Sequence, residues 1–164
     1  MYLNDFGGVH TNSGIPNKVF YLTVQGDEHY GVQVASFEED IIQSRHIASN
    51  IWYAWNAYYL DLFDDFSISR DKMLLVCNDL YPGNFDFYQT VTNAWASVGI
   101  GDPIVAGDLN DDYTVNIQDV IIMVNFILGN TDYTVGQLLT ADLDQDNLFT
   151  VVDILLMINI IIYS

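Results

Sequence analysis

The feature of this sequence that most constrains its fold is a twelve-residue acidic segment that occurs twice near the C-terminus. Residues 108–119 read DLNDDYTVNIQD, and residues 142–153, 34 positions later, read DLDQDNLFTVVD. Each copy continues into about ten nearly uninterrupted apolar residues. Self-similarity at a fixed period is typical of a repeated supersecondary unit. We therefore predict a module made of two equivalent loop–helix units.

The spacing of oxygen-bearing side chains within each copy predicts a cage for a hard cation. Calcium takes six to eight oxygen ligands, and a twelve-residue loop supplies them from side chains at positions 1, 3, 5 and 12 and from the carbonyl at position 7. The first copy provides Asp108, Asn110, Asp112 and Asp119, with the carbonyl of Thr114. The second provides Asp142, Asp144, Asp146 and Asp153, with the carbonyl of Leu148.

A simpler interpretation is a pair of acidic, solvated turns, because Asp and Asn are common turn residues. Two such segments in register favour two calcium sites instead. Position 6 distinguishes the copies, because the loop turns sharply there and usually carries Gly. Asn147 tolerates a left-handed backbone, whereas Tyr113 would be strained by about 1–2 kcal/mol. We expect the first site to bind calcium more weakly.

The apolar segments at 119–128 and 153–162 are predicted to be helices. They are far shorter than the roughly 20 residues that span a bilayer, so we expect no membrane span. Two short helices bury only one stripe each against one another. The remaining apolar surface is either covered by the rest of the chain or offered to a partner.

A duplicated calcium loop followed by a helix, with a short linker helix between the copies, resembles a dockerin over residues 102–164. The resemblance implies a calcium-dependent module of a secreted enzyme that docks onto a cohesin-like scaffold or cell-surface protein. The chain departs from the family pattern at loop positions 10 and 11, where hydroxyl residues are common. Those positions hold Ile117, Gln118, Val151 and Val152.

The charge pattern divides the chain near Gly101. Residues 1–101 hold 12 acidic and 4 basic groups, a net charge of −8, and residues 102–164 hold 10 acidic and no basic groups, a net charge of −10. The total of −18 argues against nucleic-acid partners, whose phosphates attract Lys and Arg. Cys77 is the single cysteine and is expected to be a small buried hydrophobe. The N-terminus lacks the pattern of a signal peptide.

The first 101 residues are predicted to form a small helical bundle, which makes the whole chain all-α. One helix is expected over 17–24 after Ser13 and Pro16, and another over 68–80. Two further stripes of apolar residues recur at helical spacing. They consist of Ile41, Ala48, Ile51, Trp52, Trp55 and Tyr59, and of Phe87, Tyr88, Val91, Ala94, Trp95 and Val98.

The N-terminal sequence Asp5-Phe6-Gly7-Gly8-Val9-His10 is the candidate for chemistry in this region. Two glycines permit a tight turn, which is expected to place Asp5 and His10 together on a loop rim. A carboxylate that accepts one imidazole N–H orients the ring and favours its protonated form. On their own, an Asp and a His at this spacing are also compatible with chance.

Further matching segments make 1–101 resemble the helical C-terminal domain of thermolysin-like metallopeptidases. They are GGVH at 7–10, NSGI at 12–15, FYL at 20–22, HYGV at 29–32, IWY at 51–53, DLY at 79–81 and NAW at 93–95. The resemblance implies that His10 hydrogen-bonds the developing oxyanion and that Asp5 orients it. It also implies zinc in the complete enzyme, held by a His-Glu-x-x-His helix and a later Glu.

No His-Glu-x-x-His occurs in this chain, so it contains no zinc ligands of that kind and is expected to be inactive alone. We expect the C-terminal portion of a larger secreted endopeptidase, separated from its zinc-binding half by truncation of the coding frame or by processing. Its substrate would be a peptide, and its location extracellular or at the cell surface. The alternative is a non-catalytic, calcium-dependent docking module.

Overall fold

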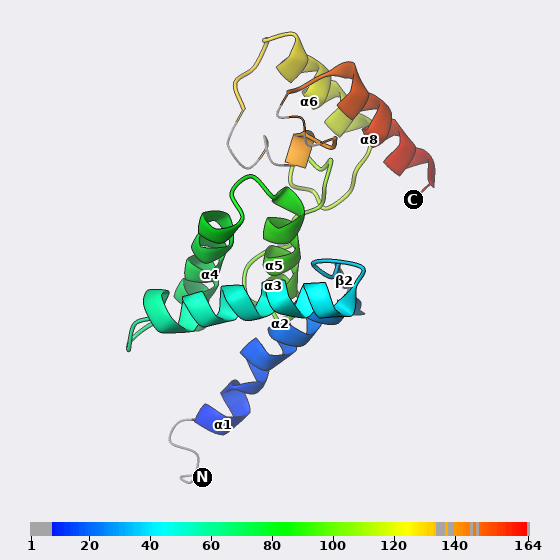
Figure 1. Ribbon diagram of the computed structural model, residues 1–164. Coiled ribbons are helices and arrows are strands. Elements are labelled where there is room, and N and C mark those ends of the chain that lie inside the picture. Colours follow the sequence, from blue (N-terminus) through cyan, green and yellow to red (C-terminus); the bar gives the residue numbers. More distant parts are fainter. Residues whose placement is uncertain (1–7, 134–136, 138–139, 145, 147, 164) are drawn as a thin grey trace. The chain divides into compact units, whose positions relative to one another are not determined.

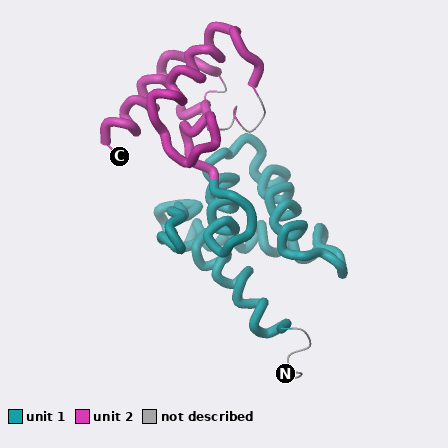
Figure 2. The backbone as a smooth tube through the Cα atoms, turned by 180° about the vertical axis from the view of Figure 1, so that it is seen from behind, with its two compact units in different colours: residues 1–103 teal, residues 104–164 magenta. Residues whose placement is uncertain are grey.

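The computed structural model divides the chain into two compact units, residues 1–103 and 104–164 (Figure 2). It describes residues 8–133, 137, 140–144, 146 and 148–163. Asp5 and Asn147 therefore lie outside the described residues, as does part of the segment predicted to hold a linker helix. None of the described helices is long and apolar enough to cross a membrane.

Unit 1 is a bundle of helices with one small hairpin (Figure 1). Its helices are α1 (Val9–Asn12), α2 (Gly14–Gln25), α3 (Ile41–Ala54), α4 (Phe66–Leu80) and α5 (Phe85–Ser97), and a π-helical turn, η1 (Trp55–Tyr59), extends α3. The two antiparallel strands are β1 (Asp27–His29) and β2 (Val32–Val34), with His29 opposite Val32. The predicted all-α class is confirmed, and the hairpin is an element that the sequence pattern did not predict.

Side-chain caps explain where three of these helices begin. The carboxylates of Asp40 and Asp65 and the amide oxygen of Asn84 accept hydrogen bonds from backbone N–H groups in the first turns of α3, α4 and α5. Such caps satisfy donors that have no partner inside the helix. α4 therefore begins at Phe66, two residues before the predicted start. α2 begins at Gly14 rather than at residue 17, and Ser13 precedes it without a side-chain cap.

The core of unit 1 is centred on Trp95, which is fully buried. Its ring lies 6.2 Å from that of Trp55 and 6.4 Å from that of Phe66, and its indole N–H donates to the sulfur of Met73 at 3.2 Å. α5, which carries Trp95, packs against α2, α4 and β2. Buried aromatic side chains contribute the largest apolar areas of a core. Unit 1 is therefore held together mainly by apolar burial.

Unit 2 contains the helices α6 (Ile117–Ile127) and α8 (Val151–Tyr163), which pack against each other. Among its described residues, the buried apolar ones are few: Leu109, Val120, Met123, Phe126, Ala141 and Met157. Each helix begins within the last four positions of one acidic segment. The predicted pair of loop–helix units is thus present, with both acidic segments leading into a helix.

Candidate metal centres

The first acidic loop is tied to its own helix by Asp119. This side chain is fully buried in the first turn of α6. Its Oδ1 accepts hydrogen bonds from the backbone N–H of Leu109 at 2.8 Å and of Asn110 at 3.3 Å. Its Oδ2 accepts from the N–H of Asn116 at 2.9 Å. The residue at the last loop position thereby joins the beginning of the loop to the first turn of the helix.

The second loop repeats this arrangement around Asp153, which is also fully buried. Its Oδ1 accepts from the N–H of Leu143 at 2.9 Å and of Asp144 at 3.4 Å, and its Oδ2 accepts from that of Thr150 at 2.8 Å. The donors are the residues 34 positions after those of the first loop. The sequence repeat is therefore also a repeat of the hydrogen-bond network.

The carboxylate of Asp108 organises the turn of the first loop. Its Oδ2 accepts from the N–H of Tyr113 at 2.7 Å, and its Oδ1 from that of Asp112 at 3.3 Å. Tyr113 has φ 63°, as the prediction for the sharp position-6 turn requires. The Oδ1 of Asp112 in turn accepts from the N–H of Thr114 at 2.9 Å. The backbone N–H groups of the loop thus point inward to the carboxylates of Asp108 and Asp112.

Three carboxylates of the second loop lie together. One oxygen from each of Asp142, Asp144 and Asp146 falls within 4.8 Å of the others. The pKa of the Asp144 carboxyl is raised above its ordinary value. The main cause is partial desolvation of the group, and the smaller cause is the negative charge of Asp146, Asp153 and Asp142. Carboxylates at such distances repel one another unless a cation lies among them. The all-oxygen donor set is the one calcium prefers.

The first loop differs at position 3, where Asn110 stands in place of an Asp. Its Nδ2 donates to Asp112 Oδ2 at 3.1 Å and to the Gln118 side chain at 3.2 Å, while its Oδ1 accepts from the N–H of Asp112 at 2.9 Å. The side-chain amide of Asn116 donates to the carbonyl of Thr114 at 3.2 Å. At positions 1, 3, 5 and 12 the first loop therefore carries one carboxylate fewer than the second, and its amide groups make hydrogen bonds within the loop.

The buried charge of unit 2 has no basic counterpart within the unit. Asp119 and Asp153 are fully buried and Asp108 is 5% exposed, yet the sequence contains no Lys, Arg or His after Lys72. Buried carboxylates are ordinarily paired with a cation or coordinate a metal. Hydrogen bonds to N–H groups leave lone pairs on these oxygens for coordination. The residues present therefore fit calcium at each loop.

Two functional residues were missed in the sequence, Asn116 and Thr150 at loop position 9. Asn116 Oδ1 accepts from the N–H of Gln118 at 2.8 Å, and Asp119 closes a reciprocal capping box with it. Thr150 Oγ1 accepts from the N–H of Val152 at 3.1 Å. The signal was available, because Asn116-x-x-Asp119 and Thr150-x-x-Asp153 have capping-box spacing. The same aspartate thus closes the loop and begins the helix.

His10 lies in α1 and not on a loop rim, so that expectation is corrected. Gly8, with φ 92°, precedes α1, and the chain enters the helix directly after it. His10 is exposed, and its carbonyl accepts a hydrogen bond from Ser13 Oγ at 2.7 Å. The other two histidines lie on different elements, His29 in β1 and His46 in α3.

Comparison with known proteins assigns both units. Residues 1–100 match the thermolysin metallopeptidase alpha-helical domain, which is more than half of the chain. The chain belongs to the thermolysin metallopeptidase family. Residues 106–162 match the dockerin type I domain. A dockerin implies calcium binding and a cohesin partner, and the thermolysin family implies zinc in the full enzyme.

Curated relatives of this thermolysin-family chain match it over somewhat more than half of its length. A bacillolysin of Brevibacillus brevis is 38% identical over 96 residues, and neutral protease B of Bacillus subtilis (strain 168) is 36% identical over 96 residues. A thermolysin of Alicyclobacillus acidocaldarius subsp. acidocaldarius is 38% identical over 96 residues. Each alignment covers 58% of the chain but only 16–17% of the relative's length.

Proposed function

We propose that this chain is the C-terminal part of a secreted thermolysin-like zinc metalloendopeptidase, joined to a dockerin module that attaches it to a cohesin-type partner. The observation that carries the proposal is the direct succession of the two family matches, 1–100 and 106–162. The proposed location is outside the cell or at its surface. We further propose domain limits of 1–101 and 102–164, with the zinc-binding half of the enzyme supplied outside these residues.

Unit 1 would supply one wall of the peptide-binding cleft. His10 would donate a hydrogen bond to the oxygen that gains negative charge as water attacks the peptide carbonyl, and Asp5 would orient the ring. The exposed position of His10 in α1 supports this role, because the ring is accessible to a substrate. Zinc in the complete enzyme would polarise the attacking water and the carbonyl.

The test of this role is His10→Ala in a protein that includes the zinc-binding half. A single oxyanion donor is worth about 10²–10³ in kcat, so turnover of a peptide substrate should fall by that factor with little change in KM. His46→Ala is the matched control, because His46 is exposed on α3. Unchanged turnover in His10→Ala would remove the catalytic part of the proposal.

Unit 2 would bind two calcium ions and, once ordered, dock onto the partner. Side-chain oxygens would come from Asp108, Asn110, Asp112, Asp119, Asp142, Asp144, Asp146 and Asp153, with the carbonyls of Thr114 and Leu148. The hydrogen-bond network that both loops share supports two equivalent sites. Isothermal titration of the calcium-free chain with calcium should give two binding events per molecule.

Exposed apolar side chains on both helices form the proposed docking face. Ile117 and Ile121 on α6 and Leu128 at its C-cap are each more than half exposed. The equivalent positions on α8 are held by Val151, Leu155 and Ile162. A large apolar surface left open on a small domain is typical of an interaction site.

Titration of a recombinant cohesin domain should show calcium-dependent binding. Ile121→Asp and Leu155→Asp combined should abolish it, whereas Tyr53→Asp in unit 1 should not.

A second candidate function is calcium-dependent docking without catalysis. It is favoured by one observation, the lack of any His-Glu-x-x-His in this sequence. The two functions differ in a direct assay of the chain mixed with a separately produced zinc-binding half. Recovery of peptide hydrolysis supports the enzyme, and cohesin binding without recovered hydrolysis supports the docking module.

A further inference from the structure

A hollow of about 640 Å³ in unit 1 has no role in the proposed function. It is formed by α1, the start of α2, the β1–β2 turn and the end of α5. The polar and apolar side chains that define it are Thr11, Ile15, Lys18, His29, Tyr30 and Ser97. Its volume lies within the range of about 300–1,000 Å³ that small-molecule sites occupy.

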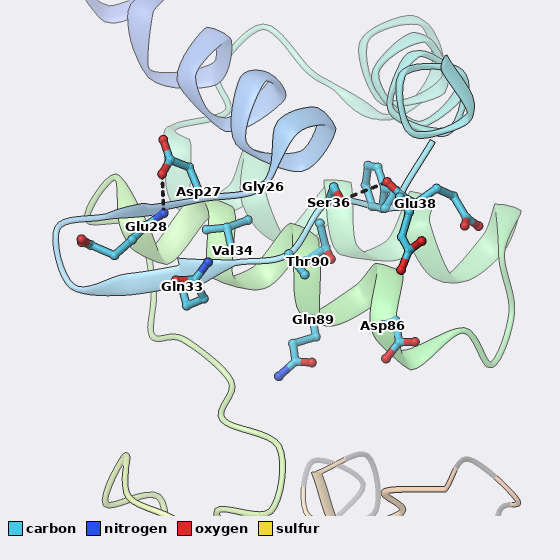
Figure 3. A pocket seen from close by; sticks show the side chains of 13 residues that line it. Gly26, Asp27, Glu28, Gln33, Val34, Ser36, Glu38, Asp86, Gln89 and Thr90 are labelled. Atoms are coloured by element: carbon cyan, nitrogen blue, oxygen red, sulfur yellow. Dashed lines mark hydrogen bonds between the residues drawn. The ribbon is translucent and has the colours of Figure 1, made fainter. Parts of the chain in front are cut away.

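The charge of this hollow is opposite to that of the rest of the chain. None of its lining residues is an Asp or a Glu, although the sequence holds 22 acidic and 4 basic residues. A second hollow of about 690 Å³ on the same unit has the common pattern, with Asp27, Glu38 and Asp86 among its lining residues (Figure 3). The hollow around Lys18 is therefore the one suited to an anion.

Lys18 is available to act as a counter-ion. Two other cations are already engaged, since Arg70 contacts Asp71 and Lys72 contacts Asp61 and Asp64. Among the described residues, no carboxylate lies within ion-pair distance of Lys18. Its ammonium instead stands 4.7 Å from the centre of the Tyr21 ring, and the side chain is half-buried. A cation–π contact of this kind holds the ammonium without neutralising its charge.

The part of the hollow formed by the hairpin turn and the end of α5 is also held in place. His29 Nδ1 lies 2.9 Å from the carbonyl oxygen of Ser97, and because a carbonyl only accepts, Nδ1 carries the proton. The Tyr30 ring packs edge-on to His29 at 4.6 Å, and Tyr30 adopts φ 50°. Glu28 Oε1 accepts from the N–H of Gly31 at 2.6 Å, which fixes the turn. The ring nitrogen Nε2 is used by none of the hydrogen bonds between described residues.

We infer that this hollow binds a carboxylate carried by a peptide, with Lys18 as its counter-ion and the His29 and Tyr30 side chains as its polar wall. A carboxylate and an ammonium make a charge-assisted hydrogen bond, which is stronger than a neutral one. Two sources offer the same group, a Glu or Asp side chain and a peptide C-terminus. The inference does not depend on zinc, on the cohesin partner or on peptidase activity.

The test is an NMR titration of the whole chain, with calcium, against three small probes. N-acetylalanine carries a C-terminal carboxylate, N-acetylglutamic acid α-amide carries a side-chain carboxylate, and N-acetylglutamine amide is neutral. We expect saturable shifts at His29, Tyr30 and Ser97 with at least one carboxylate probe, at about millimolar Kd, and none with the neutral probe. The probe that binds more tightly identifies the source.

Matched variants locate the binding on Lys18. Lys18→Met keeps the aliphatic stem over Tyr21 and should weaken binding at least tenfold, whereas Lys18→Arg should retain it. Arg45→Met is the control, because Arg45 is an exposed cation of α3 that does not line the hollow. Gly14→Met is a second variant, because a Cβ at Gly14 meets nothing within 4 Å and the longer side chain should obstruct the hollow.

Two results would overturn the inference. One is the lack of saturable shifts with both carboxylate probes, or equal shifts with the neutral one. The other is equal affinity of the wild type and Lys18→Met, with backbone spectra that show both to be folded. Neither result bears on hydrolysis by the complete enzyme or on calcium binding by unit 2.

Discussion

Units 1 and 2 are stabilised in different ways. Unit 1 buries a large aromatic core around Trp95, and its cations and carboxylates are mostly near the surface. Unit 2 has a short core and buries Asp119 and Asp153 in a segment without a single basic residue. Small domains bury too little apolar surface for high stability and often rely on a metal. The difference indicates that a cation contributes to the fold of unit 2, whereas the described residues of unit 1 are held mainly by apolar burial.

The largest predicted effect comes from removing calcium. Two carboxylates about 4 Å apart repel by about 4 kcal/mol at an effective dielectric of 20, so a chelator should unfold unit 2. Unit 1 should be unaffected. Amide NMR spectra with and without chelator measure both units in one sample. Loss of the unit 1 signals, or unchanged unit 2 signals, would contradict the comparison.

The second effect is expected from the core of unit 1. Trp95→Ala removes a fully buried side chain, and such deletions typically destabilise by about 3–5 kcal/mol. Thermal or urea unfolding should show that unit 1 loses this stability while calcium binding by unit 2 is retained. Tyr53→Ala is the control, because Tyr53 is 67% exposed. Equal losses in the two variants would mean that the core is not the source of stability.

The third effect tests the buried aspartates of unit 2. Asp153→Asn keeps the shape but replaces one acceptor oxygen by an NH₂ group that faces backbone N–H donors. Leaving such buried groups unsatisfied costs about 1–3 kcal/mol, in addition to the loss of a calcium ligand. Calcium affinity and the unfolding midpoint should both fall. Asp132→Asn is a matched control, because Asp132 is exposed outside both loops.

Regular features of the fold could be predicted from the sequence, because they depend on periodicity and capping. The stripes that contain Trp55 and Trp95 lie in helices except at Val98, which follows the end of α5. Tyr113 has the left-handed backbone that its loop position predicted. The hairpin was missed because its strands have three residues each, too few to show an alternating pattern. The π-helical turn at Trp55–Tyr59 was missed because apolar spacing does not distinguish it from an α-helix.

The candidate sites were predictable to different degrees for the same reason. The side chains of each acidic loop are close together in the sequence, so their spacing alone predicted that Asp142, Asp144 and Asp146 meet. The structure places one oxygen of each close to the others. The hollow around Lys18 joins residues far apart in the sequence, such as His29 and Ser97, which are 68 positions apart. No local pattern reports such a contact, because it depends on the packing of α5 against the hairpin.

The fourth effect is confined to one loop and sharpens the comparison within unit 2. Tyr113 holds φ 63°, where a residue with a side chain is strained by about 1–2 kcal/mol. Tyr113→Gly should remove this strain and tighten calcium binding to the first loop about fivefold, since 1 kcal/mol corresponds to roughly that factor. Calorimetric titration should show the two calcium affinities moving closer together. Tyr133→Gly, another half-exposed tyrosine of unit 2, should not raise calcium affinity.

The smallest predicted effect concerns an ion pair of unit 1 and its response to acid. Lys72 Nζ lies 2.7 Å from oxygens of Asp61 and Asp64, and the hydrogen bond from Lys72 lowers the pKa of the Asp64 carboxyl below its ordinary value of 3.8. A lowered pKa in the folded state gives stability that is present above pH 3.8 and is lost as the pH falls through the folded-state pKa. Lys72 keeps its second partner when Asp64 is replaced, because Asp61 also contacts it, and Asp61 is 81% exposed, where ion pairs contribute little. Asp64→Asn should therefore lower the melting temperature of unit 1 slightly at pH 7, and the difference from wild type should vanish in strong acid. A difference that persists in strong acid would contradict the role of the Asp64 charge. It would show that Asp64 acts by accepting the hydrogen bond from the N–H of Asp61. The amide oxygen of the variant is a weaker acceptor of that bond at every pH.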